Sequence, residues 1–174
     1  ASDTGEIAFS DVFVPEEHLL GEENGGFQQI MANFAWERLL MSIGAIGAMD
    51  RLIEVSVNYA KERQAFGRPI GSFQAIRHKI AMMATRTEAS RAFAYDTLRR
   101  FHEGEVVVRE VSMSKLDSQR ALVDIADEAI QIHGGYGYMR EYEVERALRD
   151  ARLGPIGGGT DEIMMEIIGK TYGL

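Results

Sequence analysis

Three long stretches of helical periodicity constrain the fold of this chain most strongly. Apolar residues recur every three or four positions over residues 26–63, 72–104 and 106–132. The residues that mark the three apolar faces are Leu39, Ile43, Ile46, Ile53 and Val57, then Ile76, Ile80, Met83 and Ala84, then Leu122, Ile125, Ala126, Ala129 and Ile130. A helix with one apolar face is stable only when that face is buried, so the three helices must pack together.

Glycine-rich turns separate these helices. The stretch "FGRPIGS" ends the first one, and Ser72 is a plausible N-cap for the second. The stretch "HGGYGY" ends the third, a shorter helix follows over residues 141–152, and "GPIGGGT" leads to a last helix over 160–171 with Thr160 as N-cap. Tight turns place consecutive helices antiparallel, so we predict an all-α, antiparallel bundle of the four-helix type.

The first residues have a different pattern. In "EIAFSDVFVP", Ile7, Phe9 and Phe13 alternate with polar or small residues, which predicts one β-strand that ends at Pro15. Nothing later in the chain reads as a partner strand, and a lone strand cannot satisfy its backbone hydrogen bonds. We therefore expect residues 1–22 to be the remnant of a β domain, residues 23–174 to be a helical domain, and the chain to be the C-terminal part of a longer protein.

Composition excludes several classes of function. The formal net charge of −8 argues against nucleic acid or an anionic membrane as the main partner. The absence of cysteine removes disulfides, a thiolate nucleophile and Cys-ligated zinc, and the spacing of His102 and His133 is not that of metal ligands. No apolar run approaches the roughly 18–20 residues that a membrane span needs.

Two turns carry candidate ligand-binding residues. In "ERQAFGRPIGSFQ", Arg63, Phe66 and Gln74 surround a glycine–proline turn. They could hold phosphates and polar ring edges, or they could be a loop with a solvated arginine and a packed phenylalanine. In "QIHGGYGY", Gln131 precedes Gly134 and Gly135. The two glycines could admit a flat or charged ligand close to the backbone, or they could be a helix C-cap with aromatic neighbours.

Two further stretches raise the question of chemistry. The turn "IGGGTDEI" resembles anion-holding turns at helix N-termini, although a glycine turn is a weak signal by itself. In "NFAWERLLMS", Glu37 and Arg38 sit among aromatic and aliphatic residues. They could be a surface ion pair, or Glu37 could be enclosed by aromatic rings that raise the pKa of its carboxyl, so that it acts as a base.

Taken together, these stretches resemble the C-terminal part of the acyl-CoA dehydrogenases. The stretch "SDVFVPEEHLLGEENGGF" resembles the end of that family's middle β domain. The stretches "YAKERQAFGRPIGSFQAIRHKIA", "QIHGGYGYMREYEVERALRDAR" and "PIGGGTDEIMMEII" resemble its helical-domain signatures, in the same order and at fitting separations. The resemblance covers essentially the whole chain.

The resemblance implies an FAD-dependent enzyme that oxidises the Cα–Cβ bond of an acyl-CoA thioester to a trans-2-enoyl-CoA. It also implies an electron-transfer flavoprotein as partner, a homotetramer or homodimer, and a location in the bacterial cytoplasm or, in a eukaryote, the mitochondrial matrix. The residues that it assigns to FAD are Arg63, Phe66 and Gln74, usually in contact with a neighbouring subunit's FAD, then Gln131, Gly134 and Gly135, and finally Thr160 and Glu162. The residues that it assigns to the substrate are Arg38, Gly158 and Gly159.

The catalytic base is the point at which this sequence departs from many family members. Those members carry a catalytic glutamate at the position of Gly158. A branch that includes isovaleryl-CoA and long-chain acyl-CoA dehydrogenases takes its base from the first long helix, and "WERLLMSIGAIG" places Glu37 there. We expect Glu37 to take the α-proton, the Gly158 N–H to bind the thioester oxygen, and hydride to pass from Cβ to flavin N5. An oxidase-like flavoenzyme and a non-catalytic assembly bundle are the alternatives.

Overall fold

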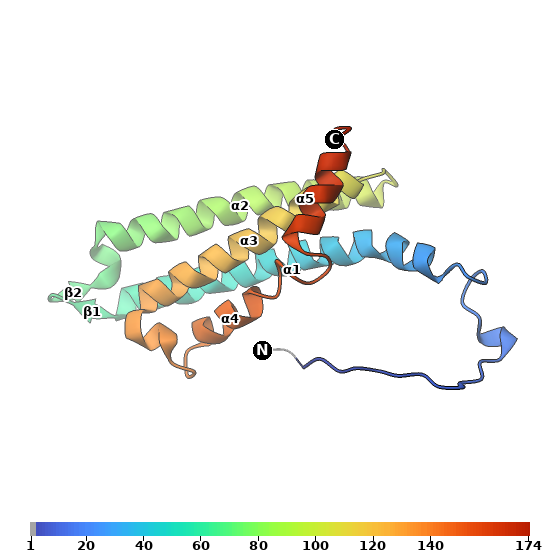
Figure 1. The fold of residues 1–174 in the computed structure, drawn as a ribbon. Helices are drawn as coiled ribbons and strands as arrows, with labels where there is room; N and C mark the ends of the chain where they lie inside the picture. Colours follow the sequence, from blue (N-terminus) through green and yellow to red (C-terminus); the bar gives the residue numbers. More distant parts are fainter. Residues whose placement is uncertain (1–2) are drawn as a thin grey trace.

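The computed structural model describes residues 3–174 and shows a bundle of helices (Figure 1). Its α-helices are α1 (Gly26–Glu62), α2 (Gln74–His102), α3 (Val108–His133), α4 (Glu143–Ala151) and α5 (Asp161–Lys170). Three short 3-10 helices were not predicted: η1 (Glu16–His18), η2 (Ile70–Ser72) and η3 (Gly134–Tyr138). The predicted all-α, antiparallel bundle is confirmed.

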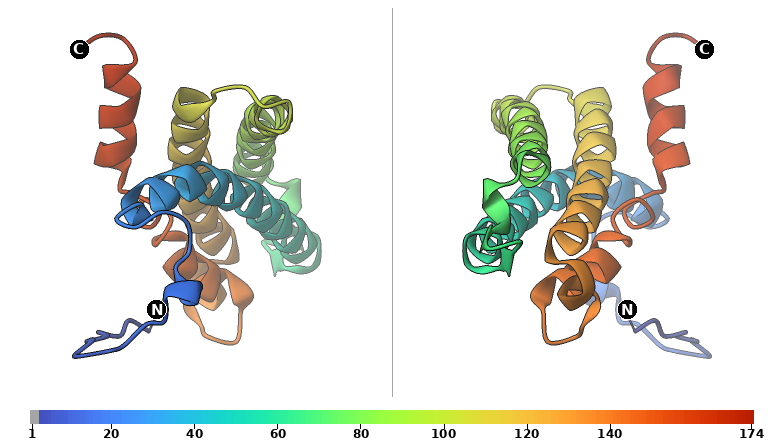
Figure 2. Two further views of the ribbon diagram at one scale, coloured as in Figure 1. Left: turned by 90° about the vertical axis from the view of Figure 1, so that its right-hand side faces the viewer. Right: turned by 90° about the vertical axis from the view of Figure 1, so that its left-hand side faces the viewer.

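The core lies where α1, α2 and α3 meet. Figure 2 shows α1 running obliquely across the foreshortened α2 and α3, with α4 below them and α5 standing to one side. Small and large apolar side chains alternate in the core, as close packing of helices requires. The buried members include Ala45, Ile46, Met49 and Leu52 of α1, Met83 and Ala94 of α2, and Ala121, Ile125, Ala126 and Ala129 of α3.

The helix ends test two predicted N-caps. Thr160 caps α5 as expected, because its Oγ1 accepts a hydrogen bond from the Ile163 N–H at 3.4 Å. The prediction for Ser72 was wrong: α2 begins at Gln74 after Phe73, and the Ser72 hydroxyl donates instead to the Pro69 carbonyl at 2.7 Å. Ser72 belongs to η2, and its hydroxyl group is already hydrogen-bonded within that turn.

The break between α1 and α2 is more ordered than a loop. Strands β1 (Gln64–Ala65) and β2 (Arg68–Pro69) pair antiparallel, with Ala65 opposite Arg68. Phe66 and Gly67 form the tip between them, both with positive φ, 51° and 77°. This backbone conformation is uncommon for phenylalanine, and it leaves the Phe66 side chain 96% exposed.

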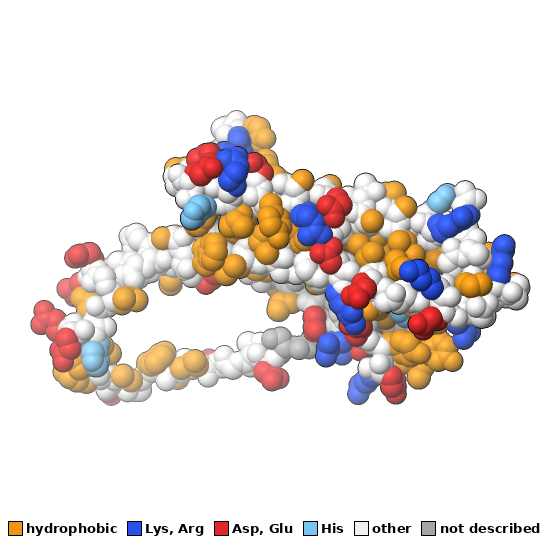
Figure 3. Space-filling model, turned by 180° about the vertical axis from the view of Figure 1, so that it is seen from behind, with side chains coloured by type: hydrophobic (Ala, Val, Ile, Leu, Met, Phe, Trp, Pro, Cys, Tyr) orange, Lys and Arg blue, Asp and Glu red, His pale blue; other side chains and the backbone are white. Residues whose placement is uncertain are grey.

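The predicted N-terminal strand is not formed within the part of the chain that the structure describes. Residues 3–15 carry no strand, and they form an extended arm that turns back from the start of α1 and runs apart from the helices (Figure 1). Ile7, Phe9 and Phe13 are all more than three-quarters exposed, and apolar side chains appear at intervals along this arm in Figure 3. The physical reason is that a strand requires a hydrogen-bonded partner, and residues 3–174 offer none here.

The two short helices are attached mainly to α3. Helix α5 is anchored by the fully buried Met164 and by Asp161 at its first position. Helix α4 contributes Val144 and Ala151 to buried positions. Within residues 3–174 no helix is both long and apolar enough to cross a membrane.

Two methionines provide a matched test of this core. Met49 is 0% exposed, whereas Met82 is 67% exposed. We expect Met49→Ala to lower the free energy of unfolding by about 2–5 kcal/mol, because it removes buried apolar contacts and leaves a cavity. Met82→Ala should change it by less than about 0.5 kcal/mol. Urea unfolding followed by circular dichroism measures both, and equal effects would contradict this placement of the core.

Candidate active site

The glycine turn before α5 is held from two sides of the bundle. Arg38 of α1 donates from Nε to the Gly158 carbonyl at 2.8 Å, across 120 residues of chain. Lys115 of α3 donates from Nζ to the Gly159 carbonyl at 2.7 Å. Two consecutive carbonyl groups therefore accept hydrogen bonds from cationic side chains, and these bonds fix the orientation of both peptides.

The backbone conformation of this turn requires glycine. Gly158 and Gly159 have φ of +66° and +98°. A Cβ atom built on Gly158 would lie 2.8 Å from the Met41 sulfur, and one built on Gly159 would lie 2.9 Å from Cε of Met164. A side chain at position 158 would therefore need both a strained backbone and a displaced methionine.

The N-terminus of α5 continues the turn. The Asp161 N–H donates to the Pro155 carbonyl at 3.0 Å, and Arg120 donates from Nε to Asp161 Oδ2 at 2.7 Å. Asp161 Oδ1 is buried and has no hydrogen-bond partner among the described residues. Hydrogen bonds to its own backbone N–H and to the Thr160 hydroxyl lower the pKa of the exposed Glu162 carboxyl.

Glu37 lies one residue before Arg38, and its side chain is exposed. Asn33 donates from Nδ2 to Glu37 Oε1 at 2.7 Å. The two interpretations of this stretch can now be compared. Glu37 and Arg38 form no ion pair within residues 3–174, so the surface-pair interpretation is wrong. The aromatic enclosure is not formed by these residues either, because Trp36 stacks on Phe101 at 5.8 Å.

Arg38 is packed rather than solvated. Its guanidinium lies over the Phe34 ring at 5.2 Å, and burial lowers the pKa of this group. An arginine has so high an ordinary pKa that it remains cationic at neutral pH. Arg38 therefore brings a positive charge, as well as a hydrogen-bond donor, to the glycine turn.

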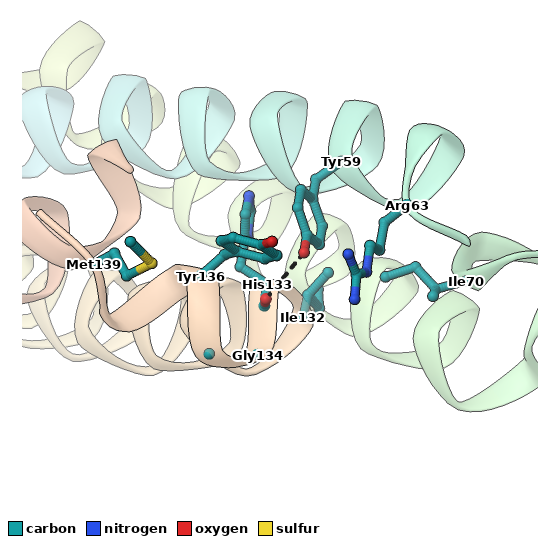
Figure 4. Close-up of a pocket in the computed structure, with 9 residues that line it drawn as sticks. Tyr59, Arg63, Ile70, Ile132, His133, Gly134, Tyr136 and Met139 are labelled. Carbon is teal, nitrogen blue, oxygen red and sulfur yellow. Dashed lines mark hydrogen bonds between the residues drawn. The ribbon is translucent and has the colours of Figure 1, made fainter. Parts of the chain in front are cut away.

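A second candidate region lies at the other end of the bundle. It is a hollow of about 570 Å³ whose lining includes Tyr59, Arg63, His133, Gly134 and Gly135. Figure 4 shows Tyr59 and Arg63 reaching from α1 toward the end of α3. The Tyr59 hydroxyl donates to the His133 carbonyl at 3.2 Å, and their rings stack at 4.2 Å. Gly134 has φ of +60°, and a Cβ built on either glycine would meet nothing within 4 Å.

The structure brings together only part of the expected FAD set. Arg63, Gly134 and Gly135 line the hollow, whereas Phe66, Gln74 and Gln131 do not. Phe66 lies at the hairpin tip, the Gln74 amide is 3.2 Å from the His78 ring, and Gln131 is exposed on the last turn of α3. All of these positions lie around one end of the bundle, away from the turn before α5 (Figure 1).

His133 packs into the bundle at the end of α3. It is buried, and its Nδ1 lies 2.8 Å from the Ala129 carbonyl. No group of His, Cys, Asp and Glu side chains among residues 3–174 could hold a metal ion. Burial lowers the pKa of the His133 imidazole below its ordinary value of 6.5.

Comparison with known proteins identifies the class to which this fold and site belong. The family model for "Acyl-CoA dehydrogenase, C-terminal domain" matches residues 24–173. Mitochondrial isovaleryl-CoA dehydrogenase of Oryza sativa subsp. japonica is 43% identical over 97% of this chain and 41% of its own length. Mitochondrial long-chain specific acyl-CoA dehydrogenase of Mus musculus is 41% identical over 98% of this chain and 40% of its own. The chain thus spans about two fifths of these relatives.

Solved structures agree with the sequence relatives. A probable acyl-CoA dehydrogenase from Mycobacterium abscessus superposes with a TM-score of 0.92 at 45% identity, over 95% of this chain and 44% of that one. A structure of PigA with FAD and proline superposes with a TM-score of 0.90 at 32% identity, over 95% of this chain and 43% of that one. This chain belongs to the acyl-CoA dehydrogenase family, and it is the family's C-terminal helical domain.

Sequence reasoning missed the part that α3 plays at the turn. Lys115 lies seven residues before Leu122, on the face that the apolar stripe marks for burial, and a lysine in that position was the available signal. Gln119, one helical turn further on, donates from Nε2 to the Met41 carbonyl at 2.7 Å. Arg120 had no comparable signal, because its partner Asp161 lies 41 residues away.

Replacing Gly158 tests the geometry of the turn. We expect Gly158→Ala to lower the free energy of unfolding by about 1–3 kcal/mol, because it combines a positive φ with a clash against Met41. The matched control is Gly47→Ala in the middle of α1, where a Cβ meets nothing within 4 Å. That change should stabilise the chain by about 0.5–1 kcal/mol. Urea unfolding measures both, and a neutral Gly158→Ala would contradict the strained turn.

Titration of His133 tests its burial. NMR of the imidazole ring should give a pKa below 6.5. The folded state then prefers the neutral ring, so this contribution to stability is complete above about pH 6.5 and is lost as the pH falls through the lowered pKa. His133→Gln should assign the resonance and reduce the fall in stability over that range. A pKa at or above 6.5 would mean that the ring is not desolvated.

Proposed function

We propose that this chain is the C-terminal domain of an FAD-dependent acyl-CoA dehydrogenase that converts an acyl-CoA thioester to its trans-2-enoyl-CoA. In this proposal residues 1–22 are the end of the preceding β domain, and residues 23–174 are the helical domain. The observation that carries the proposal is the 2.8 Å hydrogen bond from Arg38 Nε to the Gly158 carbonyl. It joins the Glu–Arg pair of α1 to a turn that has no carboxylate at position 158.

Glu37 is the proposed base. The reaction needs one carboxylate near the substrate Cα, and the turn cannot supply it, because position 158 is glycine and Met41 occupies the adjacent space. Glu37 neighbours the residue that binds the turn, and Asn33 holds one of its oxygens at 2.7 Å. The other oxygen makes no hydrogen bond among the described residues. That second oxygen is the one proposed to take the α-proton.

The Gly158 N–H is the proposed donor to the thioester oxygen. Negative charge develops on that oxygen as the α-proton leaves, so a fixed donor stabilises the transition state more than the ground state. Among residues 3–174 this N–H makes no backbone hydrogen bond. Arg38 holds the carbonyl of the same residue, and it also places a positive charge close to the developing negative charge.

The residues around the hollow fit FAD. Arg63 supplies a guanidinium, and Gly134 and Gly135 leave open space above their backbone, as a diphosphate or a ring edge requires. The remaining proposed FAD residues, Thr160 and Glu162, lie at the N-terminus of α5, beside the glycine turn. Bound FAD would supply the hydride acceptor, flavin N5, for the Cβ hydrogen. The solved PigA structure with FAD supports this assignment for the same fold.

The separation of the two places supports a homodimer or homotetramer. The end of α1, the β1–β2 hairpin, the start of α2 and the end of α3 lie at one end of the bundle, and the start of α5 lies away from them (Figure 1). The two sets of residues therefore need not contact the same FAD molecule. We infer that the first set binds the FAD of a neighbouring subunit.

The partners and the compartment follow from the same proposal. An electron-transfer flavoprotein would reoxidise the enzyme, and a solved structure titled "Electron transferring flavoprotein of Acidaminococcus fermentans" contains a chain of this fold, with a TM-score of 0.91. The bacterial cytoplasm or the mitochondrial matrix is the expected compartment.

Replacing Glu37 tests the assignment in the full-length enzyme. Anaerobic addition of an acyl-CoA should bleach the flavin of the wild type. Glu37→Gln should reduce the bleaching rate by at least about a thousandfold, because no carboxylate takes the α-proton, while the FAD content is unchanged. The control is Glu54→Gln on the same helix, which removes only an exposed pair with Arg51. Retained bleaching in Glu37→Gln would remove Glu37 from the mechanism, and wild-type flavin that no acyl-CoA bleaches would overturn the proposed function.

A further inference from the structure

We propose that Lys115 is a positioning residue for the reaction: it fixes the Gly159–Thr160 peptide, and through that peptide the glycine turn that carries the Gly158 N–H. The inference rests on the proposed function, since it concerns how the same turn presents its donors. Nothing in the spacing of the glycine turn requires a lysine on another helix. The structure provides three independent reasons for assigning this role to it.

The first reason is the burial of Lys115. The residue is 0% exposed, which is rare for a lysine because removing an ammonium from water is costly. The hydrogen bond that it donates goes from Nζ to the Gly159 carbonyl at 2.7 Å. A buried lysine whose ammonium is directed at one backbone carbonyl is suited to fixing that carbonyl. If the position needed only apolar packing, methionine or leucine would fill it without the free-energy cost of desolvating an ammonium.

The second reason is the geometry of a trans peptide. The C=O and N–H of one peptide point in opposite directions. Lys115 holds the Gly159 carbonyl, so the Thr160 N–H of the same peptide points away from α3. Arg38 holds the Gly158 carbonyl, so the Gly159 N–H points away from α1. The two cations therefore turn a pair of consecutive N–H groups outward, and each cation polarises its peptide in the direction that strengthens the N–H donor.

The third reason is the charge around the ammonium. Asp161 Oδ1 is buried with no hydrogen-bond partner in the described residues, and Asp161 favours the charged form of Lys115. Burial and the nearby Arg38 oppose it, and together they lower the pKa of the Lys115 ammonium. Glu162 also favours the charged form. One buried cation thus feels the charge of two carboxylates at the start of α5 and of the guanidinium that binds the Gly158 carbonyl.

Two further residues of α3 also form hydrogen bonds to the elements around the glycine turn. Gln119, four residues after Lys115, binds the Met41 carbonyl of α1 at 2.7 Å. Arg120 binds Asp161 at the start of α5. One face of α3 therefore fixes the glycine turn, the segment of α1 that carries Glu37 and Arg38, and the helix that follows the turn. Lys115 is the member of this set that donates a hydrogen bond to a carbonyl of the Gly158–Gly159 pair.

Hydrogen exchange and kinetics of the full-length holoenzyme test the proposal. Lys115→Met keeps the length of the side chain and removes its donor. We expect the amides of residues 158–160 to exchange at least about tenfold faster, and kcat to fall by roughly 10- to 100-fold, because a donor displaced by about 1 Å is enough for such a loss. The value of KM should stay within about threefold, and the FAD content should be unchanged.

The control is Lys79→Met, which removes a lysine that pairs with Glu128 on the surface between α2 and α3. It should change neither exchange at the turn nor kcat. If Lys115→Met does not fold, Lys115→Gln replaces it, because its side chain is one bond shorter and carries no charge. The same changes in amide exchange at residues 158–160 and in kcat are expected for that variant.

Three results would overturn the inference. They are unchanged exchange at residues 158–160, faster exchange spread along the whole of α3, and unchanged kcat in a folded variant with altered exchange at the turn. The proposed function is decided separately by the wild type. If no acyl-CoA bleaches the wild-type flavin, that function fails, and the exchange data alone then show whether Lys115 fixes the turn.

Discussion

The burial of α3 against α1 is the interaction on which the rest of this structure depends. Helix α3 carries small residues where the helices approach, among them Ser112, Ala121 and Ala129, all fully buried. Small side chains allow close contact between helices, and larger residues of α1 such as Met49 fill the space beside them. The Ser112 hydroxyl satisfies its hydrogen bond within the helix, by donating to the Val108 carbonyl at 2.8 Å. A polar residue can therefore be buried there at little cost.

This packing places both attachment points of the glycine turn. Arg38 projects from α1 and Lys115 from α3, so the position of the turn follows from the position of the two helices. The turn contributes no side chain to its own placement at Gly158 and Gly159, where glycine is required by conformation and by space. The chemistry proposed here uses this division: the turn offers backbone donors, and the helix offers the carboxylate. A carboxylate at position 158 would have to displace Met41.

The same bundle leaves one end open to ligand and one flank exposed. The hollow beside Arg63 and Gly134 is lined by a guanidinium, by tyrosine rings and by apolar side chains, which suits a cofactor with a charged and a flat part. Large apolar side chains are exposed along the N-terminal arm and on the first turns of α1. Patches of this kind mark surfaces that other protein covers. They agree with the fact that the chain spans about two fifths of its relatives.

Helical periodicity and glycine placement in the sequence were sufficient to predict the bundle, because a repeated apolar face and a tight turn act locally. Thr160 as N-cap followed for the same reason. Four ordered motifs were sufficient for the family, and the comparisons confirm it. The sequence could not show that Arg38 binds the turn instead of Glu37, or that Lys115 and Asp161 meet there. Those contacts join residues that lie 41 to 120 positions apart, and their geometry exists only once the helices have packed.

The errors have the same physical origin. Alternation at Ile7, Phe9 and Phe13 predicts a strand, but strand formation depends on a partner and not on the segment itself. Ser72 is a residue type that caps helices, but its hydroxyl donates to the Pro69 carbonyl in the turn before the helix. By itself, the sequence determined which segments are helices, where they turn and to which family they belong. The tertiary structure alone decided which charged groups leave water and which backbone carbonyls they hold, because burial and long-range hydrogen bonding are properties of the packed chain.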